Sequence, residues 1–186
     1  FTGYAAFGNM IFFGLGAYAV GVVMVKLGLS FFIGLMAAGL VGIVAAILIG
    51  MPLLRLKGHY FALASLGAAE ALRQIMDNMT DLTGGAMGIT LPQMVGKPAA
   101  VNTNFYYIMF GLLLASFGVT YFFSKRRLGY ALKAIKANEE AADVMGINTT
   151  LYKIIAWSIS GLFTAMAGGI YAYWFTFIEP VVVFDV

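Results

Sequence analysis

Long apolar runs alternate with short polar segments along the whole chain. Five runs stand out, at residues 1–25, 27–54, 60–79, 105–123 and 154–178. Four of them contain no charged residue, and about 20 helical residues are enough to cross a hydrocarbon core of roughly 30 Å. The pattern therefore predicts an all-α, polytopic transmembrane helical bundle with about five membrane segments.

The third run differs from the others because it carries charge. Glu70, Arg73 and Asp77 lie three and four positions apart, so a helix places them on one face, where Glu70 and Arg73 can pair. Charges at membrane depth are costly and often mark a pathway, so this pair is a candidate pathway site. The alternative is a structural ion pair near a helix end. Residues 60–79 either span fully or form a broken or re-entrant segment.

Small residues recur at every fourth position in two of the runs. This spacing places them on one helix face, where the backbones of neighbouring helices can approach closely. We expect this packing to lie within one subunit, with a dimerisation face as the alternative. The positions are Ala38, Gly42, Ala46 and Gly50 in the second run, and Gly161, Ala165 and Gly169 in the fifth.

Composition narrows the function classes. The chain of 186 residues is 62% hydrophobic and only 10% charged, whereas soluble domains average about 25% charged residues. It contains no cysteine, and no zinc-ligand spacing, catalytic triad, carboxylate dyad or nucleotide-binding P-loop can be assembled from it. We therefore expect no catalytic residue, metal site or cofactor, and no nucleic-acid partner.

The first residue, Phe1, has no basic segment before the apolar run. We therefore expect the sequence to be an internal portion of a longer chain. Residues 1–186 are interpreted as a single transmembrane domain.

Clustered basic residues predict the orientation of this domain. Lys and Arg near the ends of spans accumulate on the cytoplasmic side, which places the loop of residues 124–153 in the cytoplasm. Five crossings then bring a second basic pair inside and leave two lysines outside. The loop residues are Lys125, Arg126, Arg127, Lys133 and Lys136, the inner pair is Arg55 and Lys57, and the outer residues are Lys26 and Lys97.

A glycine-rich segment follows the third run, on the predicted outer side. Thr83, Gly84, Gly85 and Gly88 belong to the sequence LTGGAMGITLP, whose glycines permit turns that other residues resist. No Lys-Ser or Lys-Thr follows the glycines, so a phosphate cradle is not indicated. We interpret these four residues as a possible outer vestibule.

The loop of residues 124–153 contains its own short helix. Asn138 is a favoured N-cap, Glu139 and Glu140 occupy the first turn, and Gly146 suits the position after the helix. The predicted helix, Glu139 to Met145, is too short to be stable alone in water. A simple connector needs fewer residues than this loop has, so we expect it to dock onto a soluble partner.

The amino-acid sequence of this loop resembles that of a known family. EEAADVMGIN, between RRLGYALKAIKANE and TTLYKIIAWSISGLFTAMAGGIYAY, resembles the cytoplasmic loop of ATP-binding-cassette (ABC) importer permeases, specifically the branched-chain amino-acid permeases of the LivM type. LRLKGHYFALASLGAAEALRQI and FTGYAAFGNMIFFGLGAY resemble further segments of the same family. The likeness extends over nearly the whole chain.

This resemblance implies a transport subunit rather than an enzyme. Its partners would be cytoplasmic ABC ATPase subunits, a second permease subunit that is homologous or identical, an extracytoplasmic substrate-binding protein, a small-molecule substrate and the lipid bilayer. The location would be the bacterial inner membrane. Substrate, branched-chain or other hydrophobic amino acids, would cross by alternating access. The residues that couple the loop to the ATPase would be Glu139, Glu140, Ala141, Ala142 and Gly146.

Three alternatives remain open on the sequence. An importer for urea or short amides can be built on the same permease family. A secondary carrier without ATP would need an ionisable group at the membrane midplane, for which Glu70 is the candidate. A purely structural membrane subunit would not depend on Glu70 or Gly146 for transport.

Overall fold

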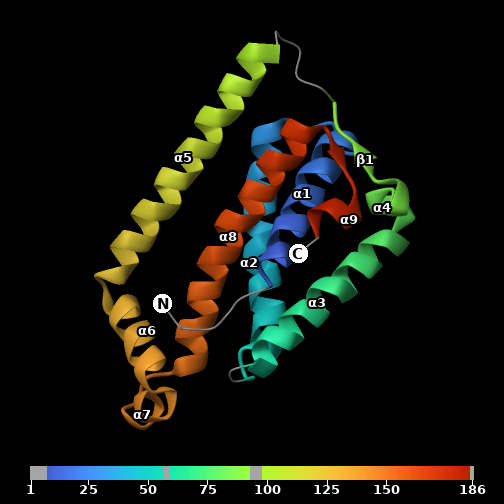
Figure 1. The fold of residues 1–186 in the computed structure, drawn as a ribbon. Helices are drawn as coiled ribbons and strands as arrows, with labels where there is room; N and C mark the ends of the chain where they lie inside the picture. Colours follow the sequence, from blue (N-terminus) through green and yellow to red (C-terminus); the bar gives the residue numbers. More distant parts are fainter. Residues whose placement is uncertain (1–7, 57–58, 93–97, 185–186) are drawn as a thin grey trace.

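The computed structural model describes residues 8–56, 59–92 and 98–184. Nearly all of this is helical, and two short strands pair near one end of the molecule (Figure 1). In chain order the elements are α1 Asn9–Val25, α2 Phe31–Leu53, α3 His59–Asn78, α4 Thr80–Thr83, the 3₁₀ helix η1 Gly85–Met87, β1 Ile89–Thr90, α5 Pro98–Ser124, α6 Arg127–Ala137, α7 Glu139–Val144, α8 Thr149–Phe175, β2 Phe177–Ile178 and α9 Pro180–Val183.

The core is formed where α1, α2 and α8 pack against one another (Figure 1). Small residues make this packing close: a side chain at Gly42 would lie 2.5 Å from the carbonyl oxygen of Gly161, and one at Gly168 would meet the backbone of Phe13. Ala38 and Ala165 are fully buried in the same contacts. The predicted small-residue faces therefore pack helices within the chain, as expected where shape rather than hydrophobic force joins helices.

The expected number of about five membrane segments is wrong. Within the described residues, three helices are long and apolar enough to cross a membrane, at Phe31–Leu53, Asn102–Ser124 and Thr149–Phe175. The described part of α1 is apolar but has 17 residues, fewer than the roughly 20 that a crossing needs. α3 is long enough, with 20 residues, but Glu70, Arg73 and Asp77 lower its hydropathy.

α3 is one continuous helix rather than a broken or re-entrant segment. It rises from the end of the bundle where α2 finishes and reaches the side where β1 and α4 lie (Figure 1). Only Phe61, Ser65 and Ala69 are buried along it, so most of its surface faces away from the core. Its path runs diagonally to the packed helices (Figure 1), and along it Glu70 is exposed whereas Arg73 and Asp77 are half-buried.

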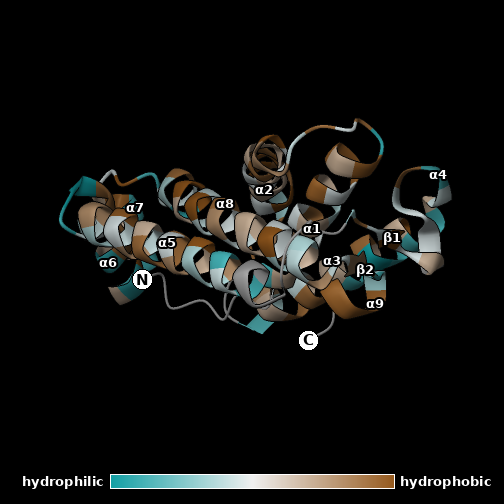
Figure 2. Cartoon of the chain, turned by 90° about the horizontal axis from the view of Figure 1, so that it is seen from above, coloured by the Kyte–Doolittle hydropathy of each residue, from teal (hydrophilic) through white to brown (hydrophobic). Residues whose placement is uncertain are grey.

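The two ends of the bundle differ in character. Arg55, at the end of α2, lies at the same end as α6 and α7, whereas Lys26 follows α1 at the opposite end (Figure 1). This agrees with the predicted distribution of basic residues, although Lys57 and Lys97 lie outside the described residues. Coloured by hydropathy, α2 is almost wholly hydrophobic, and hydrophilic segments gather around α6 and α7 and around α4 (Figure 2).

The glycine-rich segment forms a compact structure at the end of the bundle near Lys26. Gly84, Gly85 and Gly88 all have positive φ, between 59° and 72°, which L-residues with side chains rarely adopt. The single hydrogen of the Thr83 hydroxyl is shared between the carbonyl oxygens of Met76 (2.6 Å) and Met79 (2.8 Å), and its oxygen accepts from the Gly85 N–H. β1 then pairs antiparallel with β2, Ile89 opposite Ile178. Thr83 is thus buried and holds a turn together.

Candidate functional site

Two helices, α6 and α7, form a unit below α8 (Figure 1). α6 was not predicted from the sequence, where only the shorter helix of residues 139–145 was expected. It buries Gly129, Ala131, Leu132 and Ile135, so its apolar positions follow the three-and-four spacing of an amphipathic helix. That spacing was present in the sequence and could have predicted α6.

The ends of α7 agree with the sequence prediction. The Asn138 side-chain oxygen accepts a hydrogen bond from the Ala141 N–H at 3.1 Å, as an N-cap does. After the helix, Gly146 has φ +82°, its N–H donates to the Asp143 carbonyl, and the Ile147 N–H donates to the Ala142 carbonyl at 3.0 Å. The helix ends at Val144, one residue before the expected Met145.

A small apolar cluster holds α7 against its neighbours. Leu132 and Ile135 of α6 are buried together with Ala142 of α7, and the start of α8 packs against them through Tyr152 and Ala156. This cluster is separate from the main core. A helix of six residues gains its stability from such packing and from its caps, because it is too short to form alone.

An ion pair joins α7 to α8 beside this cluster. The Lys153 ammonium donates to the Glu139 carboxylate at 2.6 Å. The Lys153 side chain is only 2% exposed and that of Glu139 is 24% exposed, so the contact is largely shielded from water. Lysine is almost never fully buried unless paired, so the carboxylate accounts for the position of this side chain.

The five predicted coupling residues divide into two sets. Ala142 is buried and Glu139 turns toward Lys153, so these two face the protein. Glu140, Ala141 and Gly146 are exposed. The outer surface also carries Val144 and Met145, which are 90% and 81% exposed. The sequence interpretation did not include these two apolar residues, although they stand directly before Gly146.

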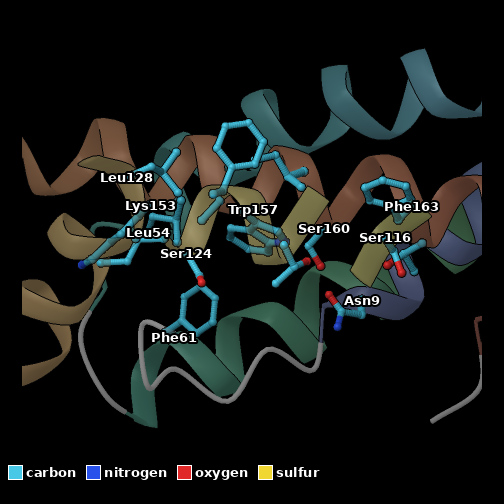
Figure 3. Close-up of a pocket in the computed structure, with 17 residues that line it drawn as sticks. Asn9, Leu54, Phe61, Ser116, Ser124, Leu128, Lys153, Trp157, Ser160 and Phe163 are labelled. Carbon is cyan, nitrogen blue, oxygen red and sulfur yellow. The ribbon is translucent and has the colours of Figure 1, made fainter. Parts of the chain in front are cut away.

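A cavity of about 400 Å³ lies between α5, α6 and α8, next to the ion pair. Lys153 and Trp157 follow one another along α8 at its edge, with Leu54 and Phe61 beside them (Figure 3). Trp157 packs edge-to-face on Phe61, with ring centroids 5.2 Å apart. The cavity therefore separates the α8 segment that holds Lys153 from α5.

The predicted pairing of Glu70 with Arg73 is confirmed. Arg73 donates through Nε to Glu70 Oε2 at 3.0 Å and through an Nη to Oε1 at 2.6 Å, and Gln74 also donates to this carboxylate. The pair lies on the open face of α3, with Glu70 52% exposed. His59 begins the same helix and is exposed. Among the described residues, no group of three or more His, Asp or Glu side chains gathers as metal ligands do.

Comparison with protein families decides the class of the molecule. The model of the family described as "Branched-chain amino acid transport system / permease component" matches residues 1–186. The chain belongs to this permease family.

Individual relatives of the permease agree with the family match. It is 30% identical over 195 residues to the high-affinity branched-chain amino acid transport system permease protein LivM of Salmonella typhimurium, and 28% identical over 198 residues to LivM of Escherichia coli. Each alignment covers 91% of the chain and 46% of the relative, so the chain spans about half the length of these curated relatives. A ribose import permease, RbsC of Bacillus subtilis, is 32% identical over 97 residues, 45% of the chain and 30% of the relative. No solved structure matches the chain.

The feature of the permease that sequence analysis missed is Lys153. Its position continues the small-residue face of α8 toward the N-terminus, because Lys153, Trp157, Gly161 and Ala165 follow at intervals of four and are all buried. The spacing alone could have placed this lysine on the packed face. Its partner could not have been identified in that way, because Glu139 lies 14 residues away on another helix.

Proposed function

We propose that this chain is the membrane part of an ABC importer permease that moves branched-chain or other hydrophobic amino acids by alternating access. The single observation that carries the proposal is the construction of α7. This helix is capped at both ends, fixed by an apolar cluster, and carries Val144 and Met145 almost fully exposed at its tip. Exposed apolar side chains on a rigid support are the kind of surface that a protein partner covers.

The proposed occupant of this surface is a cytoplasmic ATPase subunit of the importer. Five basic residues in and just before α6 support the proposal that the loop of residues 124–153 lies on the cytoplasmic side of the inner membrane, by the positive-inside rule. The 186 residues contain no nucleotide-binding P-loop, which supports the proposal that a partner subunit hydrolyses ATP. A second permease subunit and an extracytoplasmic binding protein complete the proposed assembly.

The exposed charges of α3 and the glycine-rich segment are proposed as parts of the substrate route. Glu70 and Arg73 present opposite charges side by side, which suits the ammonium and carboxylate groups of an amino acid. The segment of Thr83, Gly84, Gly85 and Gly88 is the proposed outer vestibule. Its fixed backbone supports that role because a vestibule has to keep its shape while a binding protein delivers substrate.

Co-purification tests the docking surface. The full-length permease is expressed with the ATPase subunits of its source organism, and the ATPase retained per permease is measured by quantitative gel or mass spectrometry. We expect retention by the unchanged protein, and loss in Val144→Asp, Glu140→Arg and Gly146→Trp. Met87→Asp is the matched control, because Met87 is 88% exposed at the opposite end of the bundle. Absence of ATPase from the unchanged permease contradicts the proposal.

Reconstituted transport tests the substrate class. Proteoliposomes with the complete importer receive a binding protein loaded with leucine, urea or ribose, and substrate uptake and ATPase stimulation are measured. We expect stimulation by leucine only. Stimulation by urea alone would support the amide importer, and uptake driven by a proton gradient without ATP would support a secondary carrier. Glu70→Gln should raise the KM for leucine uptake if Glu70 contacts the substrate ammonium.

A further inference from the structure

We propose that the Glu139–Lys153 ion pair ties α7 to α8, so that a movement of the docked loop reaches the membrane helices. Glu139 is the first residue of α7, and Lys153 lies in the second turn of α8. The Lys153 ammonium and the Glu139 carboxylate lie 2.6 Å apart, which joins the two helices through side chains. Both are positioning residues, and this role rests on the function proposed above.

The residues of α7 that a partner can cover are different from the residue that binds α8. Val144 and Met145 are 90% and 81% exposed, so a partner can cover them. Glu139 turns the other way, onto a lysine that is 2% exposed. A carboxylate already engaged with a buried ammonium is poorly placed to contact a partner as well. Of the two neighbouring acids at the start of α7, Glu139 therefore contacts the protein, whereas Glu140 lies on the exposed surface.

The apolar cluster around Ala142 does not replace the ion pair. Apolar contacts are non-directional, so this cluster keeps Ala142 against Leu132 and Ile135 without providing a directional bond to α8. A charge pair shielded from water is directional, because separating the two groups leaves a charge without its partner in a medium of low dielectric. The ion pair is thus the contact that resists displacement of α7 along α8.

α8 can carry such a movement into the bundle. Its middle packs against α2 where Gly161 meets Gly42, and against α1 where Gly168 meets the backbone of Phe13. Close-packed helices move as units, since their contacts leave no space for gradual deformation. Near Lys153 the packing is different, because the cavity of about 400 Å³ lies between this segment and α5 (Figure 3). The lower end of α8 therefore has free space on one side.

The experiment separates the tether from docking by measuring both. In proteoliposomes of the complete importer, the ATPase bound per permease and the substrate transported per ATP hydrolysed are determined for Lys153→Met and for the exchanged pair Glu139→Lys with Lys153→Glu. We expect Lys153→Met to retain the ATPase but to lower transport per ATP at least about fivefold, the lower range of typical coupling factors. The exchanged pair should recover at least half of the transport per ATP that Lys153→Met loses. Lys26→Met, at the exposed opposite end of the bundle, is the control and should change neither quantity.

A distance measurement tests the tether without any ATPase. Residues 1–186 contain no cysteine, so spin labels can be attached at Asp143→Cys on α7 and Leu151→Cys on α8, both exposed positions, with any cysteine elsewhere in the full-length permease replaced by serine. Pulsed electron spin resonance should give one narrow distance distribution in the full-length permease and a broader one with Lys153→Met. An unchanged distribution overturns the tether, and so does unchanged transport per ATP or loss of ATPase binding in Lys153→Met. If the unchanged permease binds no ATPase, the proposed function fails, and the label distances alone decide the tether.

Discussion

Two ion pairs among the described residues have the same closest approach and very different surroundings. Arg73–Glu70 and Lys153–Glu139 both have a closest approach of 2.6 Å. The first joins neighbouring turns of one exposed helix, whereas the second joins two helices and buries its lysine. An exposed pair is screened by water and contributes little to stability, but a buried pair that loses one partner leaves a charge in a poor solvent.

The distance between the charged groups therefore does not by itself determine the role of an ion pair, because burial also differs. Arg73 and Glu70 each keep contact with solvent, so the pair can open and exchange partners without disturbing α3. This property is compatible with transient binding of a substrate. Lys153 has no such freedom, because its position beside Trp157 is fixed by the packed face of α8. The buried pair is therefore better suited to connect α7 rigidly to α8.

The largest expected effect follows from removing the carboxylate of the buried pair. Glu139→Ala should destabilise the α7–α8 contact by about 3 kcal/mol, at the lower end for broken buried pairs because Glu139 is 24% exposed. Lys153→Met should cost less, since the carboxylate left behind can turn toward water. Hydrogen exchange of the amides of residues 138–147 measures both. Equal protection in the two variants would show that the pair behaves like an exposed one.

The next effect concerns the turn that ends α7. Gly146→Val should destabilise the same region by about 1–2 kcal/mol, because Gly146 has φ +82° and a left-handed conformation is costly for residues with a side chain. A Cβ there meets no atom within 4 Å, so the effect comes from the backbone alone. Gly146→Asn is the control, since asparagine adopts this conformation readily. A large loss in both variants would instead indicate a steric effect.

A smaller effect is expected at the start of α7. Asn138→Ala removes the oxygen that accepts from the Ala141 N–H and should cost about 1 kcal/mol. Asn138→Asp keeps the acceptor and should be close to neutral. Hydrogen exchange at Ala141 separates the two variants. If Asn138→Ala leaves this amide protected, the ion pair and apolar cluster hold the helix without its cap.

The smallest effect is expected for the exposed pair. Glu70→Gln should leave the thermal unfolding midpoint of the detergent-solubilised permease unchanged within error, because the carboxylate and Arg73 are both in contact with solvent. Any change should be confined to transport. A clear fall in the unfolding midpoint would remove the contrast and show that this pair, too, is buried in the full-length assembly.

Predictions from the sequence were most accurate for contacts between residues that are close together in the chain. The capping of α7 by Asn138 and Gly146 and the pairing of Glu70 with Arg73 involve residues within a few positions of each other, so their spacing specifies their contacts. The all-α class could be predicted from the length of the apolar runs, because each run is also a continuous stretch of neighbouring residues. The number of spans was wrong because apolar runs were counted as crossings, whereas the described part of α1 has only 17 residues and α3 carries charges that lower its hydropathy.

The sequence by itself thus determined the helical membrane class, the family and the short capped helix of the loop, because these depend on composition, periodicity and near neighbours. Only the tertiary structure decided which acid of the pair Glu139 and Glu140 faces the protein. It also placed Lys153 opposite an acid 14 residues away and opened a cavity beside it. These outcomes depend on how α6, α7 and α8 fold back on one another, and a long-range contact of this kind is set by the packing of whole helices rather than by any local pattern.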